Sequence, residues 1–209
     1  MLSKETIEML KFIEKKVGGK ITHISHKQDY SLVNNHMSKI HRKPLSRFFP
    51  ATHPKKGEPT FFVEKLLKSL EITDFDILYE LGQKLGYEYH GMLEHEIESK
   101  WPKSHTIRQG DKVKVGDFIQ FYVWSGRPYH SKQIVIAYPI EVKKVWDFEV
   151  DLNCVYSING KYTNEQTDYD LAINDGLSES ELQFWFMPNY QKPKAFKGQI
   201  ICWNENIDY

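Results

Sequence analysis

Apolar residues in the first half of the chain recur every three or four positions, which is the spacing of an amphipathic helix. This spacing predicts one helix in the segment FFVEKLLKSL at 61–70. A second helix is predicted between Thr73, which is suited to cap its amino end, and Gly86, which is suited to end it. The whole region 60–100 is therefore expected to be helical. The apolar positions that share one face of the first of these helices are Phe62, Leu66, Leu67 and Leu70.

Weaker patterns precede this region. Ser3 is suited to cap a helix that ends at Gly18-Gly19, and residues 21–25 alternate like a short strand. The polar and basic segment 26–47 shows no clear period, and it is predicted to be a linker or mobile arm. We therefore expect residues 1–46 to form an N-terminal helix followed by a basic arm.

From residue 105 the apolar period changes to two, and β-branched and aromatic residues become common, as is typical of strands. Asn159-Gly160 predicts a tight hairpin turn, and the sequence from Ser178 to Glu181 predicts a capping box that opens a helix closed by Pro188. The predicted strands cover residues 105–108, 118–124, 133–138, 141–150, 154–158 and 198–203.

Six short strands with few helices favour a closed or half-closed β-barrel over a doubly wound sheet. The expected fold is therefore α+β, a small mixed β-barrel with flanking helices and an N-terminal helical extension. A domain over residues 47–209 would contain the barrel, with the helical region 60–100 as an insertion. The chain of 209 residues is long enough for one well-buried core with an appendage.

Charge is balanced overall, with 28 basic and 28 acidic residues, so bulk polyelectrolyte binding of the histone kind is excluded. Its distribution is uneven. Eight Lys or Arg and two Glu lie in residues 39–68, whereas residues 71–99 hold eight acidic residues and one lysine. The basic stretch either faces phosphates or pairs with the acidic one, and the sequence leaves both alternatives open.

The chain lacks the signals of secretion and membrane insertion. No apolar run approaches the roughly 20 residues needed to cross a bilayer, and Glu5, Glu8 and Glu14 interrupt what would be the core of a signal peptide. The two cysteines, Cys154 and Cys202, lie in apolar runs that suit buried thiols. We expect a cytoplasmic protein without membrane contact. Because metal-ligand spacings and cofactor motifs are also absent, we expect no metal and no cofactor.

The sequence KSHTIR from Lys103 to Arg108, followed by KVGD from Lys114 to Asp117, carries a resemblance to a known family. It resembles ASCH domains, whose first barrel strand carries a Lys-x-x-Thr-x-Arg pattern followed by a Lys-x-Gly-Asp turn. The resemblance extends from about residue 47, through the GEPTF segment at 57–61, to the strand at 198–203. It implies a PUA-like barrel similar to that of an uncharacterised bacterial and phage group with a WSGRPY segment, here at 124–129, and Lys132.

A more distant resemblance links the chain to ASCH-like amidohydrolases that cleave N4-acetylcytidine. It assigns catalytic roles to Lys103, Thr106 and Asp175, with hydroxyl attack on an acyl carbon. In this chain the acid is Asp rather than Glu. Asn174-Asp175-Gly176 is equally suited to a turn in which Asp175 accepts backbone amides.

The alternation of a strand places Thr106 and Arg108 on one face, with Lys103 at the strand's start. A hydroxyl beside two cations suits an anionic or carbonyl-rich ligand. The alternative is that Arg108 pairs with Asp111 or Asp117 at the surface, and that Thr106 is only a good strand former.

Two aromatic and two basic residues, Trp124, Arg127, Tyr129 and Lys132, surround a Gly/Pro turn. Flat rings stack on bases and cations contact phosphates, so these residues form a candidate wall of a nucleotide site. Ordinary packing of aromatic residues at a β-turn is the alternative. His53 joins the candidates if its loop covers the barrel mouth.

Three hypotheses about function follow. The leading one is a nucleotide- or nucleic-acid-binding module that recognises a base or modified nucleotide in a barrel pocket. The second is an amidohydrolase acting on an N4-acylated cytidine-type nucleoside. The third is a protein-interaction factor that uses the barrel as a scaffold. The expected partners are accordingly a nucleotide, a nucleoside or a nucleic acid.

Overall fold

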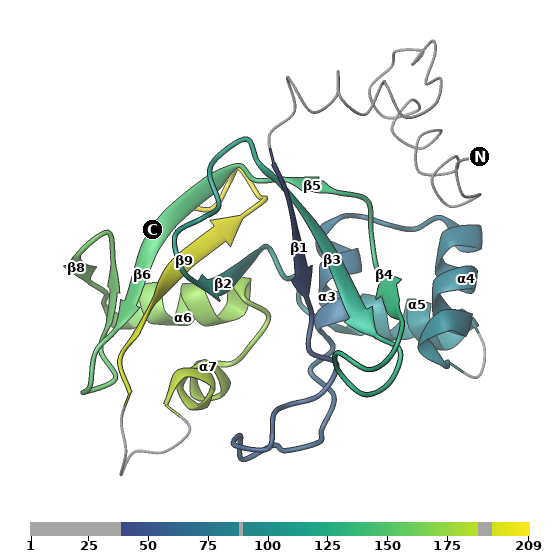
Figure 1. Cartoon of the computed structure of the whole chain (residues 1–209), viewed down its shortest axis with the longest axis horizontal. Coiled ribbons are helices and arrows are strands. Elements are labelled where there is room, and N and C mark those ends of the chain that lie inside the picture. Colours follow the sequence, from purple (N-terminus) through teal and green to yellow (C-terminus); the bar gives the residue numbers. More distant parts are fainter. Residues whose placement is uncertain (1–38, 88–89, 188–193) are drawn as a thin grey trace. The chain divides into compact units, whose positions relative to one another are not determined.

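A computed structural model describes residues 39–87, 90–187 and 194–209 of the chain. From Ile40 to Tyr209 these residues belong to one compact unit. The predicted helix that follows Ser3 and the predicted strand at 21–25 lie outside the described residues. Figure 1 shows the helices α3, α4 and α5 gathered beside one sheet, and α6 and α7 beside the other.

The described part of the region 60–100 is mainly helical, as its apolar spacing predicts. It contains α3 (Phe62–Ser69), α4 (Phe75–Leu85) and α5 (His90–Ser99). The cap of α4 is Asp74 rather than Thr73, because the Asp74 carboxylate accepts hydrogen bonds from the amides of Asp76 and Ile77. Gly86 ends the helix in the left-handed conformation, with φ of 83°.

The first sheet combines one parallel and two antiparallel neighbours around β3 (Phe118–Trp124). Strand β1 (Ile40–Pro44) pairs with β3 in parallel, whereas β4 (Gln133–Val135) and β5 (Ile140–Glu141) pair with it antiparallel. Its buried residues Phe121 and Val123 point to the side opposite to Tyr122 and Trp124, since side chains alternate along a strand.

The second sheet has the order β2-β9-β6-β7-β8 and is antiparallel throughout. Asn159 and Gly160 form the predicted tight turn between β7 and β8, with φ of 50° and 76°. Its strands are β2 (His105–Gln109), β9 (Phe196–Cys202), β6 (Lys144–Val150), β7 (Tyr156–Ile158) and β8 (Lys161–Tyr162).

A glycine permits the close approach of β2 and β9. Gly198 lies opposite Gln109 in the register of these strands. A Cβ atom at Gly198 would come within 2.1 Å of the Arg108 carbonyl oxygen. The backbone carbonyl occupies the space that any side chain would need, so residue 198 has to be glycine for this pairing.

Two helices precede β9, namely α6 (Glu165–Asn174) and α7 (Glu179–Phe186). Gly176 ends α6 with φ of 79°, while the amides of Gly176 and Leu177 donate to the carbonyls of Ile173 and Ala172. The predicted capping box of Ser178 and Glu181 then opens α7. The turn from Asn174 to Gly176 is therefore a helix end, with Asp175 as the capping residue.

The α+β class is confirmed, and several expected elements are corrected. Residues 40–44 form β1 rather than part of a linker, because the backbone of this polar segment pairs with β3 and His41 Nε2 lies 2.8 Å from Asp117 Oδ2. The predicted strand at 141–150 is divided between β5 and β6. Helix α6 was not expected, because it buries only Leu171 and Ala172 along its length.

Strand pairing among the described residues gives two separate sheets and does not close them into a barrel. Side chains connect the two sheets. The ring of Phe121 in β3 lies 5.4 Å from the ring of Trp203, the residue that follows β9. Within the same residues, no helix has both the length and the apolar character that crossing a membrane requires.

Candidate functional site

A buried ion pair lies where the end of α6 meets the start of β2. Lys103 Nζ is 2.6 Å from Asp175 Oδ1, and the lysine side chain is only 1% exposed. Backbone bonds hold the segment in place, since the amide of Lys103 donates to the Lys65 carbonyl and that of Ser104 to the Asn174 carbonyl. The end of α6 and the segment before β2 therefore bring together two residues far apart in sequence.

The lack of a side chain at Gly176 leaves space for the side chains of Lys65 and Lys103. Lys65 Nζ donates to the Gly176 carbonyl at 2.5 Å. A Cβ atom at Gly176 would lie 3.1 Å from Lys65 Cδ and 3.4 Å from Lys103 Cβ. The side of the Lys103 ammonium group is covered by the Phe62 ring, whose centroid is 4.4 Å from Nζ.

Burial dominates the electrostatics of this group. It lowers the pKa of Lys103 from 10.5 to about 8 although Asp175 attracts the ammonium group. Burial also raises the pKa of Asp175, and Lys103 and Arg108 oppose that change. Both members of the pair are thus shifted toward their neutral forms, because the attraction between the two charges does not fully offset the cost of removing each from water.

His105 extends the buried group on the other side of Asp175. Its Nδ1 lies 3.0 Å from the hydroxyl of Tyr209, and that hydroxyl also accepts a bond from the Asn174 amide. The Nε2 atom lies 3.8 Å from Asp175 Oδ1, which is too far for a hydrogen bond. Burial, followed by the Lys103 charge, lowers the pKa of His105 well below 6.5, so the ring is neutral.

Arg108 connects the buried group to the first sheet. Its Nη2 donates to the carbonyl of Pro44, at the end of β1, at 2.7 Å. Burial lowers the pKa of Arg108, while Asp175 and Tyr122 counter that effect. The Nε atom is buried without a partner in the described part of the chain. Arg108 thus interacts with the Pro44 carbonyl and with the charge of Asp175 rather than pairing with Asp111 or Asp117, the surface alternative.

Thr106 is buried in β2, two residues before Arg108. Opposite it in the register lies Ile201 of β9. Strand alternation places Thr106 and Arg108 on the same face of β2, as the sequence predicts. Of the three residues with an expected catalytic role, the structure brings Lys103 and Asp175 into direct contact.

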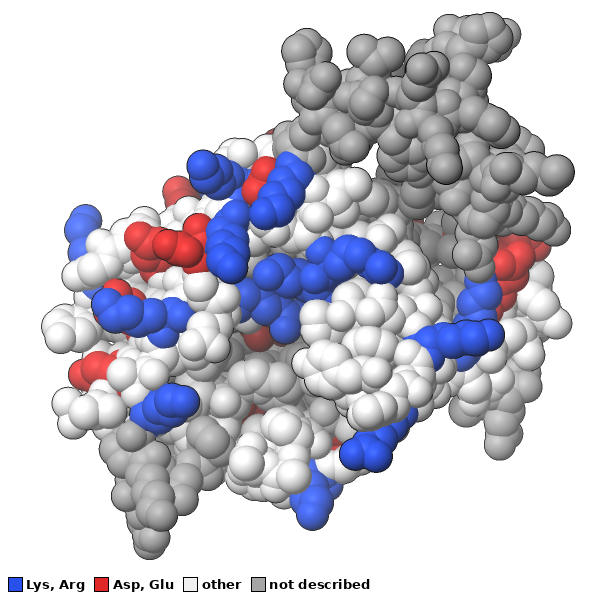
Figure 2. All heavy atoms as spheres, in the orientation of Figure 1, with Lys and Arg blue, Asp and Glu red and all other residues white. Residues whose placement is uncertain are grey.

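Aromatic and basic side chains continue along the first sheet as one strip. We use the name aromatic–cation strip for Arg42, Tyr122, Trp124 and Tyr129. Arg42 lies over the Tyr122 ring at 5.3 Å, and successive ring centroids are 5.5 Å and 5.4 Å apart. Tyr122 and Trp124 share a face of β3 because they are two residues apart. Figure 2 shows basic side chains gathered in the middle of this face of the molecule, where Figure 1 places β1.

The remaining wall residues lie in the turn between β3 and β4. Arg127 and Lys132 are exposed, and Tyr129 is 82% exposed with a left-handed φ of 65°. The Ser131 hydroxyl holds the turn by donating to the Arg127 carbonyl and accepting from the Gly126 amide. The turn therefore presents two cations and an aromatic ring to solvent next to Trp124.

His53 lies in a different group of residues. It is buried with its ring stacked on Phe49 at 4.4 Å, and its Nε2 donates to the Glu181 carbonyl at 3.3 Å. Its Nδ1 accepts the Lys55 amide. These contacts attach the loop before α3 to α7, and the bond from Lys55 to Glu181 reinforces them.

Some residues of the aromatic–cation strip and of the buried group around Asp175 were not among the expected candidates. They are Arg42 and Tyr122 in the strip, and His105 and Tyr209 in the buried group. Arg42 belongs to the basic stretch 39–68, but it was not singled out because it also lies in the segment predicted to be a linker. Tyr122 carried an available signal, since it is two residues before Trp124 in a predicted strand. His105 and Tyr209 meet across more than a hundred residues, and no local pattern indicates such a contact.

Residues 39–87, 90–187 and 194–209 contain no group of three His, Cys, Asp or Glu side chains placed to hold a metal ion. Comparison of the whole chain with protein-family models, curated proteins and solved structures finds no match.

Proposed function

We propose that this chain binds a nucleotide, free or within a single strand, on the aromatic–cation strip. The continuous contact of Arg42, Tyr122, Trp124 and Tyr129 carries the proposal. A base stacks on Trp124 and Tyr129, which are the accessible rings of the strip. The phosphate lies toward Arg42, which is exposed.

The chemistry of the strip supports this assignment. Stacking of one base on an aromatic side chain is worth about 1–3 kcal/mol and is tolerant of base identity. Guanidinium groups bind phosphate oxygens in a bidentate manner. Arg127 and Lys132, exposed on the same turn as Tyr129, provide further cations for the backbone of a longer strand.

An ASCH-type, PUA-like fold is part of the proposal. The sequence resemblance rests on the strand from Lys103 to Arg108 and on the turn from Lys114 to Asp117. Two observations support it: the first segment leads into β2, and the Asp117 carboxylate accepts the Lys114 amide to form a compact turn. The resemblance also led us to expect Lys103 and Asp175 in one site, and they lie 2.6 Å apart.

The test is a binding titration with the full chain. We expect a fluorescently labelled single-stranded RNA to bind, and Trp124→Ala to weaken binding by at least about fivefold, since the lost stacking is worth about 1–3 kcal/mol. Trp101→Ala is the matched control, because Trp101 is 59% exposed and lies outside the strip. Equal affinities for the two variants, or no binding of RNA and of free nucleotides, would refute the proposal.

The buried ion pair favours a second candidate, hydrolysis of an N4-acylated cytidine. With its pKa lowered to about 8, Lys103 exists partly as a neutral amine near neutral pH and can accept a proton. The Thr106 hydroxyl would attack the acyl carbon and pass its proton to Lys103. The amino group of cytidine would leave with that proton, and water would then release acetate from Thr106.

This second candidate requires the site to open, because Lys103, Thr106 and Asp175 are all buried. Its test is acetate release from N4-acetylcytidine at high enzyme concentration. Activity should disappear in Thr106→Ala and persist in Thr163→Ala, a threonine outside the site. Absence of turnover by the unmodified chain would eliminate the hydrolase and leave the binding proposal intact.

A further inference from the structure

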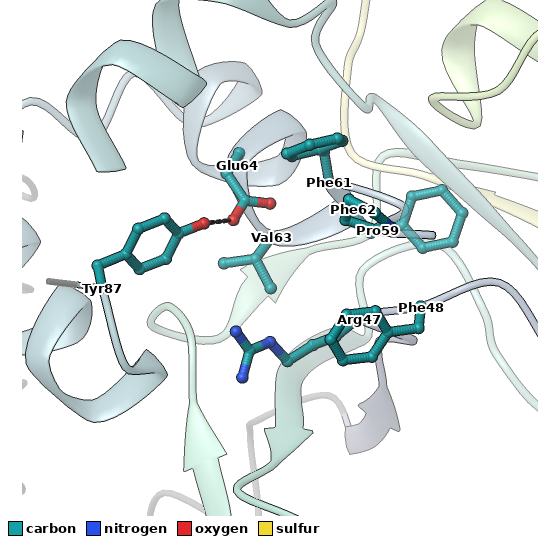
Figure 3. Close-up of a pocket in the computed structure, with 8 residues that line it drawn as sticks. All are labelled: Arg47, Phe48, Pro59, Phe61, Phe62, Val63, Glu64 and Tyr87. Carbon is teal, nitrogen blue, oxygen red and sulfur yellow. Dashed lines mark hydrogen bonds between the residues drawn. The ribbon is translucent and has the colours of Figure 1, made fainter. Parts of the chain in front are cut away.

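A recess lies beside the start of α3, apart from the aromatic–cation strip. It is a pocket of about 50 Å³, enough for roughly three to five water molecules or the head of a small molecule. Figure 3 shows its lining, in which one carboxylate, one guanidinium and several aromatic rings surround the same space.

One side of the pocket presents a hydrogen-bond acceptor. Glu64 is only 6% exposed, and its Oε1 accepts the hydroxyl of Tyr87. Burial, followed by the charge of Glu64, raises the pKa of Tyr87, so the phenol stays protonated and acts as the donor. Figure 3 shows the other oxygen of Glu64 turned toward the rings of Phe61 and Phe62. No described residue donates a hydrogen bond to that oxygen.

Another side presents a donor. Arg47 donates from Nη2 to the Leu85 carbonyl at 3.0 Å, which fixes the guanidinium at the end of α4. Its Cζ atom lies 5.8 Å from the centroid of the Phe48 ring. Arg47 and Glu64 form no ion pair with each other in the described part of the chain, so both keep hydrogen-bonding capacity for a third group.

Phe61 supplies a flat wall at a cost in backbone conformation. Its φ of 56° and ψ of 24° are left-handed, which a bulky residue rarely adopts. Lys100 Nζ lies 4.0 Å from the centroid of the ring and fixes its position. Such strain, on the order of 1–3 kcal/mol, persists where the surroundings require it and is common at ligand sites.

We propose that this pocket binds a small, neutral, planar group that carries an N–H donor beside a carbonyl, such as a primary carboxamide. The N–H donates to the unpartnered oxygen of Glu64, and the carbonyl accepts from Arg47. An anion would face the Glu64 carboxylate, and a cation would face the Arg47 guanidinium, so the neutral amide matches both walls. The inference stands independently of nucleotide binding on the strip.

Three ligands of the same shape test the proposal: benzamide, benzoate and benzamidinium. In NMR titrations of the full chain we expect benzamide to shift the amide signals of residues 61–64. Benzoate and benzamidinium should bind at least about tenfold more weakly, because each loses one charge-assisted hydrogen bond. Tighter binding of benzoate or of benzamidinium, or equal binding of all three, would overturn the proposal.

Two substitutions make the test specific to the pocket. Glu64→Gln should weaken benzamide binding about tenfold, whereas Glu58→Gln, at an exposed glutamate of the preceding loop, should leave it unchanged. Phe48→Ala removes a wall whose side chain is 54% exposed, so the chain should fold normally and still lose benzamide affinity. Unchanged affinity in both Glu64→Gln and Phe48→Ala would place benzamide elsewhere.

Discussion

The buried group around Asp175 and the aromatic–cation strip use similar side chains in opposite surroundings. Lys103 is 1% exposed, and its charge is met by the chain's own carboxylate. At the far end of the strip Tyr129 is 82% exposed, and the neighbouring Arg127 and Lys132 face solvent. One set of cations is satisfied from within the protein, and the other is open to a partner.

This difference separates two uses of charge. In the interior, the cost of desolvation is large and each charge depends on its partner, so the pair fixes how α6 meets β2 rather than adding much net stability. At the surface, solvent screens the cations, so they cost little and contribute mainly to binding of oppositely charged ligands. Arg108 connects the two regions, since the charge of Asp175 acts on it and its Nη2 donates to the carbonyl of Pro44, which lies opposite Tyr122 in the register of β1 and β3.

Removing one partner of the buried pair is expected to have the largest effect. Lys103→Met leaves the Asp175 carboxylate buried and unpaired, which should lower the free energy of unfolding by about 3–5 kcal/mol. Adding Asp175→Leu should restore most of that loss, because no uncompensated charge remains. Urea denaturation of the single and double variants measures both changes.

The control for this cycle is an exposed pair of similar geometry. Lys55 Nζ lies 2.7 Å from Glu181 Oε1, but the Lys55 side chain is 49% exposed. Lys55→Met should cost less than about 1 kcal/mol. If Lys103→Met costs no more than Lys55→Met, burial does not distinguish the two pairs.

Alkaline pH offers a second way to examine the buried pair. The pKa of Lys103 is about 8 in the folded chain, against 10.5 for an unperturbed lysine. Between these pH values the unfolded chain keeps a proton that the folded chain has lost, so stability rises with pH. We expect the free energy of unfolding, relative to the Lys103→Met/Asp175→Leu variant, to increase from pH 8 to pH 10.5. Denaturant titrations across this range that show a constant difference would contradict the shift.

The elements predicted correctly are those that local chemistry specifies. Strand β3 has the predicted bounds, because its bulky residues fill both faces of a half-buried sheet. The capping box of Ser178 and Glu181 and the turn at Asn159-Gly160 are likewise complete within a few residues. Periodicity and caps need no knowledge of distant parts of the chain, so the sequence alone indicates them.

Elements that depend on distant partners were harder to predict. The polar strand β1 acquires its structure from pairing with β3, more than seventy residues later. Helix α6 has a weak apolar face, although Asn164 was an available capping signal, since its side chain accepts the Thr167 amide. Closure of a barrel also depends on distant pairing, and counting strands does not specify which edges meet.

The candidate site shows the same division. Trp124 and Tyr129 were identified from their own segment, and they contact each other as part of the strip. Arg42 joins them only through the parallel register of β1 and β3, which the sequence did not reveal. The presence of Lys103 and Asp175 in one site was expected from the ASCH resemblance and not from any periodic pattern, whereas their direct ion pair was not predicted.

On the strip, a single substitution should change binding and leave stability intact. Tyr129→Ala removes a stacking surface and should weaken binding of single-stranded RNA by about 1–3 kcal/mol, roughly five- to 150-fold. Tyr162→Ala is the matched control, because Tyr162 is 77% exposed on β8, in the other sheet. Thermal unfolding and a binding titration of both variants separate the two effects. A Tyr129→Ala chain that loses stability but not affinity would assign this ring to packing.

The smallest expected effect is on the salt dependence of binding. If Arg42 contacts a phosphate, Arg42→Gln should reduce the slope of log affinity against log salt concentration by about 1, because one fewer counterion is released. Lys161→Gln, at an exposed cation of β8, should leave the slope unchanged. Titrations of labelled single-stranded RNA at four or more salt concentrations measure both slopes. Since Arg108 already donates to the Pro44 carbonyl, an unchanged slope in Arg42→Gln would remove the phosphate from this end of the strip, leaving Arg127 and Lys132 to hold it.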